Sequence, residues 1–255
     1  METLYIIRTN LSAENIAKLD RLKNAEACKQ AAQDPETPIE ILEELFRKFP
    51  QEVLSNQAID SLLVQKPSLF ENFFWRNTNC FKYAELPLFF QKWAASHSHS
   101  FIRSAIAGSH KASMEAIEIL AKDNNFDVIC SLLTNSKLNN SILERLALSA
   151  MKPENYNNNL IFMVGLHPNI NSELRNKVYL FCKDKHNSFN NATEVKINSY
   201  DDFYKVVKAT SIEMIRIGWS KHMGEKYLKR KYRRRSRFQL KNEQLLEFWK
   251  YLLSL

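Results

Sequence analysis

One short segment restricts the possible folds of this chain more than any other. Residues 31–45 run Ala-Ala-Gln-Asp-Pro-Glu-Thr-Pro-Ile-Glu-Ile-Leu-Glu-Glu-Leu. Asp34-Pro35 predicts a turn that ends a helix, because the residue before a proline disfavours the helical conformation. Thr37 predicts the N-cap of the next helix, with Pro38 as its first residue and Glu40 completing a capping box. The segment therefore predicts helix, turn and helix within about 25 residues.

Similar turns recur later in the chain. They begin at Ala107, Thr134 and His167, and a degenerate copy occupies Gln65–Ser68. Neighbouring copies lie about 26 to 32 residues apart, which is typical of stacked helical repeats. Apolar residues follow each turn at helical spacing: Met114, Ile117 and Leu120; Ile142, Leu143 and Leu146; Leu174 and Val178.

On these turns and apolar positions, residues 23–183 resemble the variant leucine-rich and HEAT-like repeats, in which a turn of the type D/N-P-x-T-P joins two helices. Only Asp34–Leu45 is close to that pattern, and the aromatic stretch Phe70–Trp93 is off-register. The resemblance implies an α-solenoid that presents a concave surface to partners, and it implies no particular chemistry. An irregular helical bundle is the alternative fold.

Glycine and cysteine exclude several classes of protein. The four glycines form no cluster, which disfavours P-loop nucleotidases, Rossmann dehydrogenases and typical kinases, so we expect no cofactor. Cys28, Cys80, Cys130 and Cys182 are widely separated, which predicts reduced and mostly buried thiols. His97, His99 and His110 lack a carboxylate or cysteine at a spacing typical of a metal site, so we expect no metal.

The compartment is predicted from missing signals. The first residues lack the charged and apolar regions of a signal peptide, and no apolar run approaches the roughly 18 residues needed to span a bilayer. We therefore expect a soluble, cytoplasmic protein with no membrane partner.

The last third of the chain changes character. Residues 186–199 are polar and predict a linker between a helical-repeat domain (1–185) and a small module (200–255). Ser199 and Ser220 predict the N-caps of two helices in this module, and Asn242–Leu253 predicts a third whose apolar face includes Leu253. The predicted fold class is all-α, an α-solenoid of degenerate helix-turn-helix repeats followed by a three-helix module.

The segment 217–248 contains a run of spaced markers: Gly218-Trp219-Ser220, Gly224, Tyr227-Leu228, Ser236-Arg237, Leu240, Leu245 and Phe248. On these residues it resembles a small module found mostly at the ends of bacterial, especially cyanobacterial, proteins. A related helical tail occurs on some single-strand annealing recombination proteins, which implies contact with nucleic acid. This chain departs from the pattern at Arg233-Arg234-Arg235, where Gly-Lys is commoner, and at Lys241, where Thr or Ser is commoner.

The positive charge of the chain is confined to its end. Residues 186–255 contain 15 Lys and Arg against 7 Asp and Glu, whereas the preceding residues contain 21 of each. A focused basic patch predicts a polyanionic partner. The candidate nucleic-acid-binding residues are Lys221, Lys226, Lys229, Arg230, Lys231, Tyr232, Arg233, Arg234, Arg235, Arg237 and Lys241.

Aromatic residues beside the basic run admit two interpretations. Tyr232 and Phe238 flank it, where they could stack on unpaired bases or pack the small core of the module. Trp219 is predicted in that core.

The function predicted from these features is a non-enzymatic adaptor. Its basic module contacts the phosphates of DNA or RNA, and its solenoid presents a surface to a protein partner. One alternative is a scaffold or assembly factor whose basic module docks on an acidic protein. Another is a helical-repeat DNA glycosylase, which requires a buried carboxylate beside an aromatic such as Trp75 or Trp93 on a concave surface. No Ser-His-Asp or Cys-His constellation is recognisable in the sequence.

Overall fold

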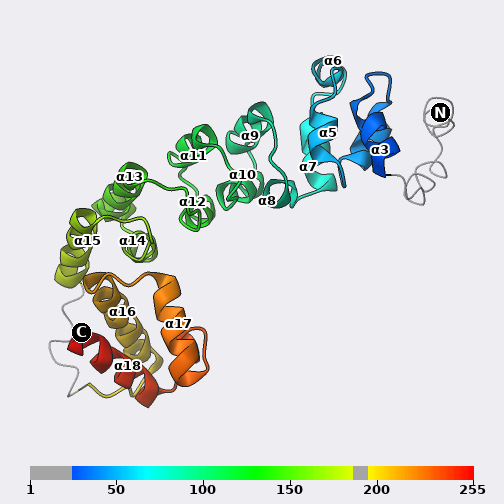
Figure 1. Cartoon of the computed structure of the whole chain (residues 1–255). Helices are drawn as coiled ribbons and strands as arrows, with labels where there is room; N and C mark the ends of the chain where they lie inside the picture. Colours follow the sequence, from blue (N-terminus) through cyan, green and yellow to red (C-terminus); the bar gives the residue numbers. More distant parts are fainter. Residues whose placement is uncertain (1–24, 186–194) are drawn as a thin grey trace. The chain divides into compact units, whose positions relative to one another are not determined.

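A computed structural model describes residues 25–185 and 195–255 (Figure 1). Every regular element within these two ranges is a helix, so the prediction of an all-α chain is confirmed. Backbone contacts divide the chain into two compact units, Met1–Asn135 and Ser136–Leu255. The repeat-like helices thus extend into both units, and the second unit includes the basic segment.

Unit 1 consists of short helices joined by tight turns. The helices are α3 (Ala25–Gln33), α4 (Ile39–Leu45), α5 (Pro50–Leu54), α6 (Ile59–Gln65), α7 (Leu69–Arg76), α8 (Cys80–Tyr83), α9 (Leu88–Ala95), α10 (Ser100–Ala107), α11 (Met114–Leu120) and α12 (Phe126–Leu132). None exceeds nine residues. Isolated helices of this length are marginal in water, so they depend on packing against one another.

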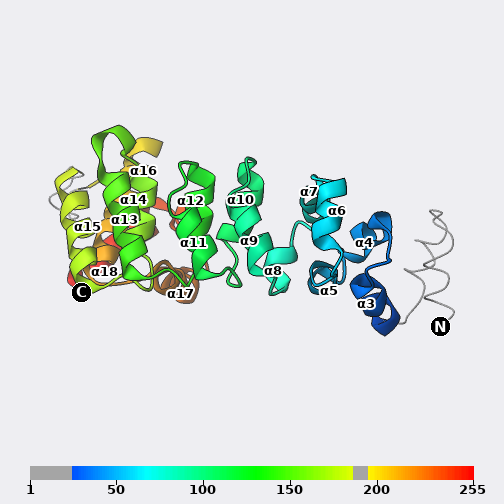
Figure 2. The ribbon, with the colours of Figure 1, turned by 90° about the horizontal axis from the view of Figure 1, so that it is seen from above.

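Helices in unit 1 pack against the second helix along the chain as well as the next one. α9 contacts α11, and α10 contacts α12, so that the two pairs lie side by side (Figures 1 and 2). The contact surfaces are the predicted apolar positions, since Ile117 and Leu120 are fully buried. Met114 precedes them at the start of α11 and is 41% exposed.

Asparagine side chains join successive turns by hydrogen bonds to the backbone. The Nδ2 atom of Asn56 donates to the carbonyls of Ala32 and Asp34, both at 2.9 Å. Asn135 repeats this arrangement with the carbonyls of Ala107 and Ser109, at 3.1 and 2.7 Å. Each asparagine therefore binds one carbonyl in the last turn of a helix, where intrahelical partners are missing, and one carbonyl of the following turn, which also accepts a backbone N–H.

The turn between α3 and α4 shows how the first predicted repeat folds. The helix α3 ends at Gln33, and Asp34 Oδ1 accepts the backbone N–H of Glu36 at 3.0 Å, so the predicted turn is confirmed. The predicted cap is wrong. The hydroxyl of buried Thr37 donates to the carbonyl of Ala31 at 2.7 Å and makes no cap bond to α4, whose N-cap residue is Pro38.

Unit 2 has longer helices. They are α13 (Asn140–Met151), α14 (Asn158–Gly165), α15 (Ser172–Lys185), α16 (Tyr200–Arg216), α17 (Lys221–Tyr232) and α18 (Asn242–Ser254), with 3₁₀ turns at Pro153–Asn155 and Arg237–Gln239. Asn169 continues the asparagine pattern here, because its Nδ2 donates to the carbonyls of Ser136 and Leu138 at 2.7 and 2.9 Å.

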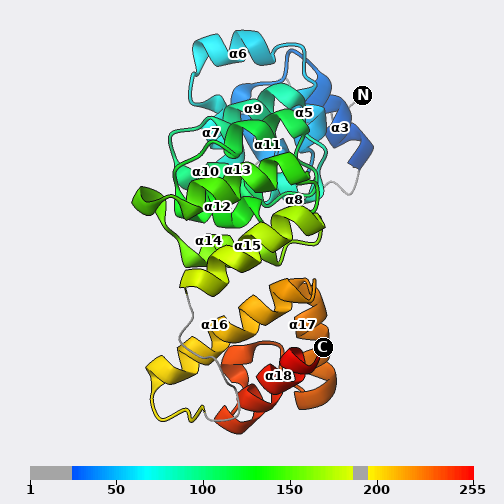
Figure 3. The ribbon, with the colours of Figure 1, turned by 90° about the vertical axis from the view of Figure 1, so that its left-hand side faces the viewer.

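α16 is the central helix of unit 2. It contacts α14 and α15 as well as α18, so the C-terminal helices share a compact unit with helices that precede the predicted linker (Figure 3). Gly165 permits this closeness. A Cβ atom built at this position would lie 2.6 Å from Ile215 Cδ1 and 2.9 Å from Val178 Cγ1.

The predicted starts of the C-terminal helices are confirmed. Ser199 Oγ accepts the backbone N–H of Asp202 at 3.1 Å, and Ser220 Oγ accepts that of Met223 at 3.3 Å. The last helix begins at Asn242 as predicted, but Leu253 is 45% exposed, so its predicted inward position is wrong. Of the predicted linker 186–199, residues 186–194 lie outside the described part of the chain, and the residues from 195 to Ser199 form no helix.

Candidate functional site

The eleven predicted binding residues occupy one continuous stretch of unit 2. Six lie on α17: Lys221, Lys226, Lys229, Arg230, Lys231 and Tyr232. Arg233, Arg234 and Arg235 form the turn after α17, Arg237 lies in the following 3₁₀ turn, and Lys241 precedes α18. The structure therefore places the basic run on one helix and the adjoining turns.

Seven of these residues form an exposed group, here called the open cations. They are Lys226, Lys229, Arg230, Arg233, Arg234, Arg235 and Lys241. No described carboxylate forms an ion pair with any of the seven. On α17, Lys226, Lys229 and Arg230 have the i, i+3, i+4 spacing that places side chains on one helix face. Their charge therefore faces solvent without an intramolecular partner among the described residues.

Lys231 and Tyr232 are engaged by one carboxylate of α18. Lys231 Nζ lies 2.7 Å from Glu247 Oε1, and the Tyr232 hydroxyl donates to Glu247 Oε2 at 3.0 Å. The hydrogen bonds from Lys231 and then Tyr232 lower the pKa of Glu247, and the bond to Glu247 raises the pKa of Lys231. These two residues fasten α17 to α18, so neither belongs to the open cations. Lys221 is also paired, more loosely, with Glu225 at 4.0 Å.

Arg237 points into the unit instead of toward solvent. Its Nη1 lies 2.7 Å from Ser211 Oγ, 2.9 Å from Thr210 Oγ1 and 3.2 Å from the carbonyl of Val207. All three acceptors belong to α16. Burial lowers the pKa of the Arg237 guanidinium to about 10. The structure thus separates Arg237 from the other predicted binding residues. Its side chain holds the 3₁₀ turn Arg237–Gln239 against α16.

Arg233 ends α17 in the left-handed conformation, with φ 57° and ψ 32°. The backbone N–H of the next residue, Arg234, bonds to the carbonyl of Leu228 at 3.4 Å, as in a Schellman ending. Glycine is the usual residue at such a position, since a side chain there costs about 1 kcal/mol. The arginine substitution noted in the sequence therefore leaves a helix-ending turn that projects three arginines in succession.

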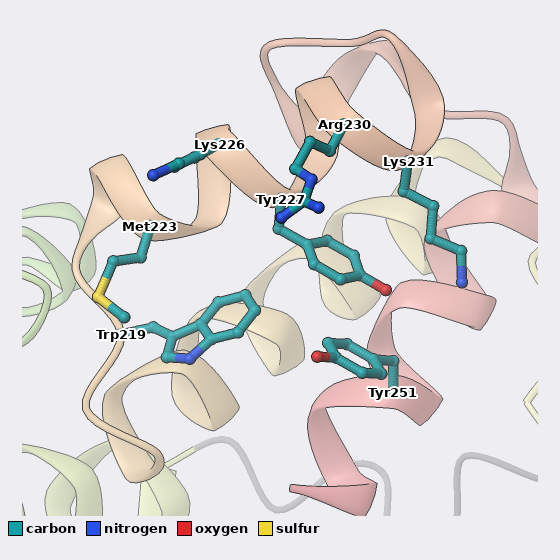
Figure 4. Close-up of a pocket in the computed structure, with 7 residues that line it drawn as sticks. All are labelled: Trp219, Met223, Lys226, Tyr227, Arg230, Lys231 and Tyr251. Carbon is teal, nitrogen blue, oxygen red and sulfur yellow. The ribbon is translucent and has the colours of Figure 1, made fainter.

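A pocket that the sequence did not indicate lies between α17 and α18. It has a volume of about 580 Å³ and is open to solvent. Figure 4 shows the rings of Trp219, Tyr227 and Tyr251 converging beneath α17, with basic side chains extending around them. The complete lining is Trp219, Met223, Lys226, Tyr227, Arg230, Lys231 and Tyr251.

The aromatic rings of the pocket contact one another. Tyr227 and Tyr251 stack with centroids 4.6 Å apart and planes at 11°, and Trp219 lies 5.6 Å from Tyr227 and 6.2 Å from Tyr251. None of the three rings is fully buried. Trp219 therefore only partly fulfils its predicted role in the core. The sequence signal for this pocket was the position of Tyr227 among Lys226, Arg230 and Lys231 on one helix.

The two aromatic residues that flank the basic run have different surroundings. Tyr232 is half-buried and bonded to Glu247, whereas Phe238 is 54% exposed beside Phe203 and Tyr204 at 6.5 and 6.3 Å. Of the two, Phe238 is the ring available to a ligand.

The histidines considered as metal ligands have other partners. His97 Nε2 lies 2.7 Å from Glu71 Oε1, and its Nδ1 accepts the backbone N–H of His99 at 3.0 Å. His99 Nδ1 accepts the backbone N–H of Phe101 at 3.2 Å and so caps α10. Within residues 25–185 and 195–255, no group of three or more His, Cys, Asp or Glu is arranged to hold a metal ion.

A buried carboxylate, the feature required of a glycosylase, does occur in unit 1. Glu43 is 6% exposed, and Oε1 lies 2.6 Å from Lys66 Nζ and 2.9 Å from Asn72 Nδ2. Arg76 lies 3.8 Å from its other oxygen. These partners hold α4 to the residues from Lys66 to Arg76, which gives Glu43 a packing role.

Comparison with known proteins adds one partial match. A segment of 51 residues is 41% identical to the uncharacterized protein slr1353 of Synechocystis sp. (strain ATCC 27184 / PCC 6803 / Kazusa). The match covers 20% of this chain and 18% of that protein. No family model and no solved structure matches the chain. None of the described helices is long and apolar enough to cross a membrane.

Proposed function

We propose that this protein is a non-enzymatic adaptor that binds nucleic acid through the open cations of unit 2. The observation that carries the proposal is the exposure of seven Lys and Arg residues with no carboxylate partner among the described residues. Phosphate groups are the anions that such an array suits, because arginine binds each phosphate with two parallel hydrogen bonds and lysine adds a point charge. The proposal assigns no reaction and no cofactor to the chain.

The remaining helices have the architecture of a solenoid in this proposal. Stacked helix pairs and the recurring asparagine bonds between turns support it, since each pair contacts mainly its neighbours in the chain. The exposed rings of Trp75 and Phe101, stacked with centroids 5.8 Å apart and planes at 2°, are the surface of unit 1 that a protein partner would cover.

The nucleic-acid proposal is tested by salt-dependent binding. Arg233, Arg234 and Arg235 are changed together to Ala, and binding of labelled DNA and RNA is measured by fluorescence anisotropy at several salt concentrations. Counterion release predicts a linear fall of log K with log salt, with about 0.9 of slope for each duplex phosphate neutralised. The variant is expected to show a slope shallower by about 2 to 3 and much weaker binding at low salt.

The matched control removes three exposed lysines outside the basic segment: Lys92, Lys122 and Lys152. It lowers the net charge by the same amount, and it is expected to bind almost as the wild type does. Equal loss in both variants would show that only net charge matters. No loss in the arginine variant would contradict the proposal, and a protein partner retained by the basic segment after nuclease treatment would favour docking on an acidic protein.

A further inference from the structure

We infer that the pocket of Trp219, Tyr227 and Tyr251 receives an unpaired nucleobase, so that the protein prefers single-stranded nucleic acid over duplex. The inference deepens the proposed function and rests on it. It concerns side chains that the phosphate-binding proposal does not use, because the open cations alone do not distinguish paired from unpaired strands.

The first step is the aromatic surface that the pocket offers. Ring contacts run from the fully buried Phe248 to Tyr227, with centroids 5.4 Å apart, and from Tyr227 to Tyr251 and Trp219. The rings are thus anchored in the core at one end and partly exposed at the other. A planar base stacks on such a surface whatever its identity, because every base has a π-face.

The second step is the charge around the rings. Lys226 and Arg230 belong to the open cations and also line the pocket. A base placed on the rings would hold its own phosphate close to these two groups, whereas a neutral apolar ligand would use neither. Aromatic faces beside a basic groove are the combination by which proteins bind single strands.

The third step is rigidity. Lys231 is held by Glu247 of α18 at 2.7 Å and lies 6.0 Å from the ring centroid of Tyr227. The same ring stacks on the buried Phe248, so contacts with α18 hold it in place. Preformed rings lose little conformational freedom on binding, which favours affinity. The volume of about 580 Å³ is within the range of about 300–1,000 Å³ typical of ligand pockets.

The test compares a labelled oligo(dT) strand with a duplex of equal length, using the full chain. Trp219→Ala and Tyr251→Ala are each expected to weaken binding of oligo(dT) about tenfold, in the range measured for loss of one stacking partner. Duplex binding and the salt slope are expected to stay unchanged, because no phosphate contact is removed. Tyr200→Ala, which removes an exposed ring at the start of α16, is the matched control and is expected to change neither.

A second measurement covers the case in which Trp219→Ala disturbs folding. Oligo(dT) is expected to quench the tryptophan fluorescence of the wild type, and the conservative variant Trp219→Phe is expected to bind within about threefold while losing most of that quenching. Thymidine monophosphate competes in a separate arm. If it displaces oligo(dT) from the pocket at equal nucleotide concentration, the ligand is a free nucleotide and the inference of strand binding is wrong.

The outcomes for the two proposals are distinguishable. Equal affinity for strand and duplex, with no effect of either aromatic variant and no quenching at Trp219, overturns the pocket inference and leaves phosphate binding intact. If the arginine variant and its lysine control bind nucleic acid with the same affinity and the same salt slope, the proposed function itself is wrong.

Discussion

At the scale of single residues, the guanidinium of Arg237 is coupled to two hydroxyl groups of α16. The hydroxyl of Thr210 accepts from Arg237 and donates to the carbonyl of Val207 at 2.7 Å, and Ser211 Oγ lies 3.3 Å from the same carbonyl. Because the group is buried, its charge depends on these dipoles. Loss of the arginine would remove the charged donor to both hydroxyl oxygens and leave these hydroxyls only their bonds to the carbonyl of Val207.

We expect Arg237→Met to lower the free energy of unfolding by about 2–3 kcal/mol, since hydrogen bonds to charged groups contribute about that much and the acceptors stay buried. Chemical denaturation measures the loss. Arg234→Ala, at an exposed arginine three residues earlier, is expected to change stability by less than about 0.5 kcal/mol. A similar effect of the two substitutions would show that Arg237 is solvated.

The two arginine variants are expected to rank in the opposite order when nucleic-acid binding is measured instead of stability. Arg234→Ala removes an open cation and is expected to weaken nucleic-acid binding. The guanidinium of Arg237 is instead engaged by three acceptors of α16, so a folded Arg237→Met variant is expected to bind with nearly unchanged affinity. Sequence could not separate these residues, because the partners of Arg237 lie 26 to 30 positions away.

At the scale of helices, close packing in unit 2 depends on Gly165 at the end of α14. Helix propensity alone favours alanine there by about 1 kcal/mol. A methyl group, however, would overlap Ile215 and Val178, which are both buried. Rigid surroundings on both sides leave the core little room to adjust.

We therefore expect Gly165→Ala to destabilise the protein by about 1–3 kcal/mol, as overpacking does. Gly108→Ala is the matched control, since a Cβ there meets no atom closer than 3.7 Å and its φ is negative. Thermal unfolding is expected to show a lower melting temperature for the first variant and an equal or higher one for the second. A stabilising Gly165→Ala would contradict the packing of α14 on α16.

Local signals explain which elements were predictable. The caps at Ser199 and Ser220 and the start of the last helix depend on residues within three or four positions, and sequence reasoning found all of them. Thr37, Glu43 and the pocket rings depend on partners in other helices. Their roles are set by packing that only the folded chain specifies, so a reading of neighbouring residues placed Thr37 in a cap and Trp219 in a core.

At the scale of the whole molecule, the two units differ in charge. Unit 2 contains 22 Lys and Arg against 11 Asp and Glu, whereas unit 1, counted over Met1–Asn135, contains 14 against 17. Screening over about 8 Å at physiological salt keeps the effect of each surface local. A polyanion would therefore be attracted to unit 2 and not to unit 1.

Each unit also contains a buried thiol whose ionisation makes the free energy of unfolding depend on pH. Burial raises the pKa of Cys80 in unit 1 and of Cys182 in unit 2 from 9.0 to about 12. Between these values the unfolded chain releases a proton that the folded chain keeps. The unfolded state then binds fewer protons than the folded state. The contribution of each thiol to the free energy of unfolding is therefore fully present below about pH 9 and is lost as the pH rises further.

We expect the free energy of unfolding to fall by about 0.8 kcal/mol per buried thiol between pH 7.5 and pH 9.5. Urea titrations at the two pH values measure the change. The variant Cys80→Ala is expected to remove the contribution of unit 1 and leave that of unit 2, and Cys182→Ala the reverse. An unchanged pH dependence in both variants would mean that neither thiol resists ionisation in the folded chain.

The asparagine bonds between turns have a consequence for how such a chain can diverge. Asn56, Asn135 and Asn169 bind carbonyl oxygens, which every amino acid supplies in the same place. Mutations can therefore replace nearly all side chains of an accepting turn, as Asp34-Pro35 and Ser109-His110 illustrate, without breaking the link. Related chains can therefore keep the same fold while their sequences diverge until alignment no longer detects the relation.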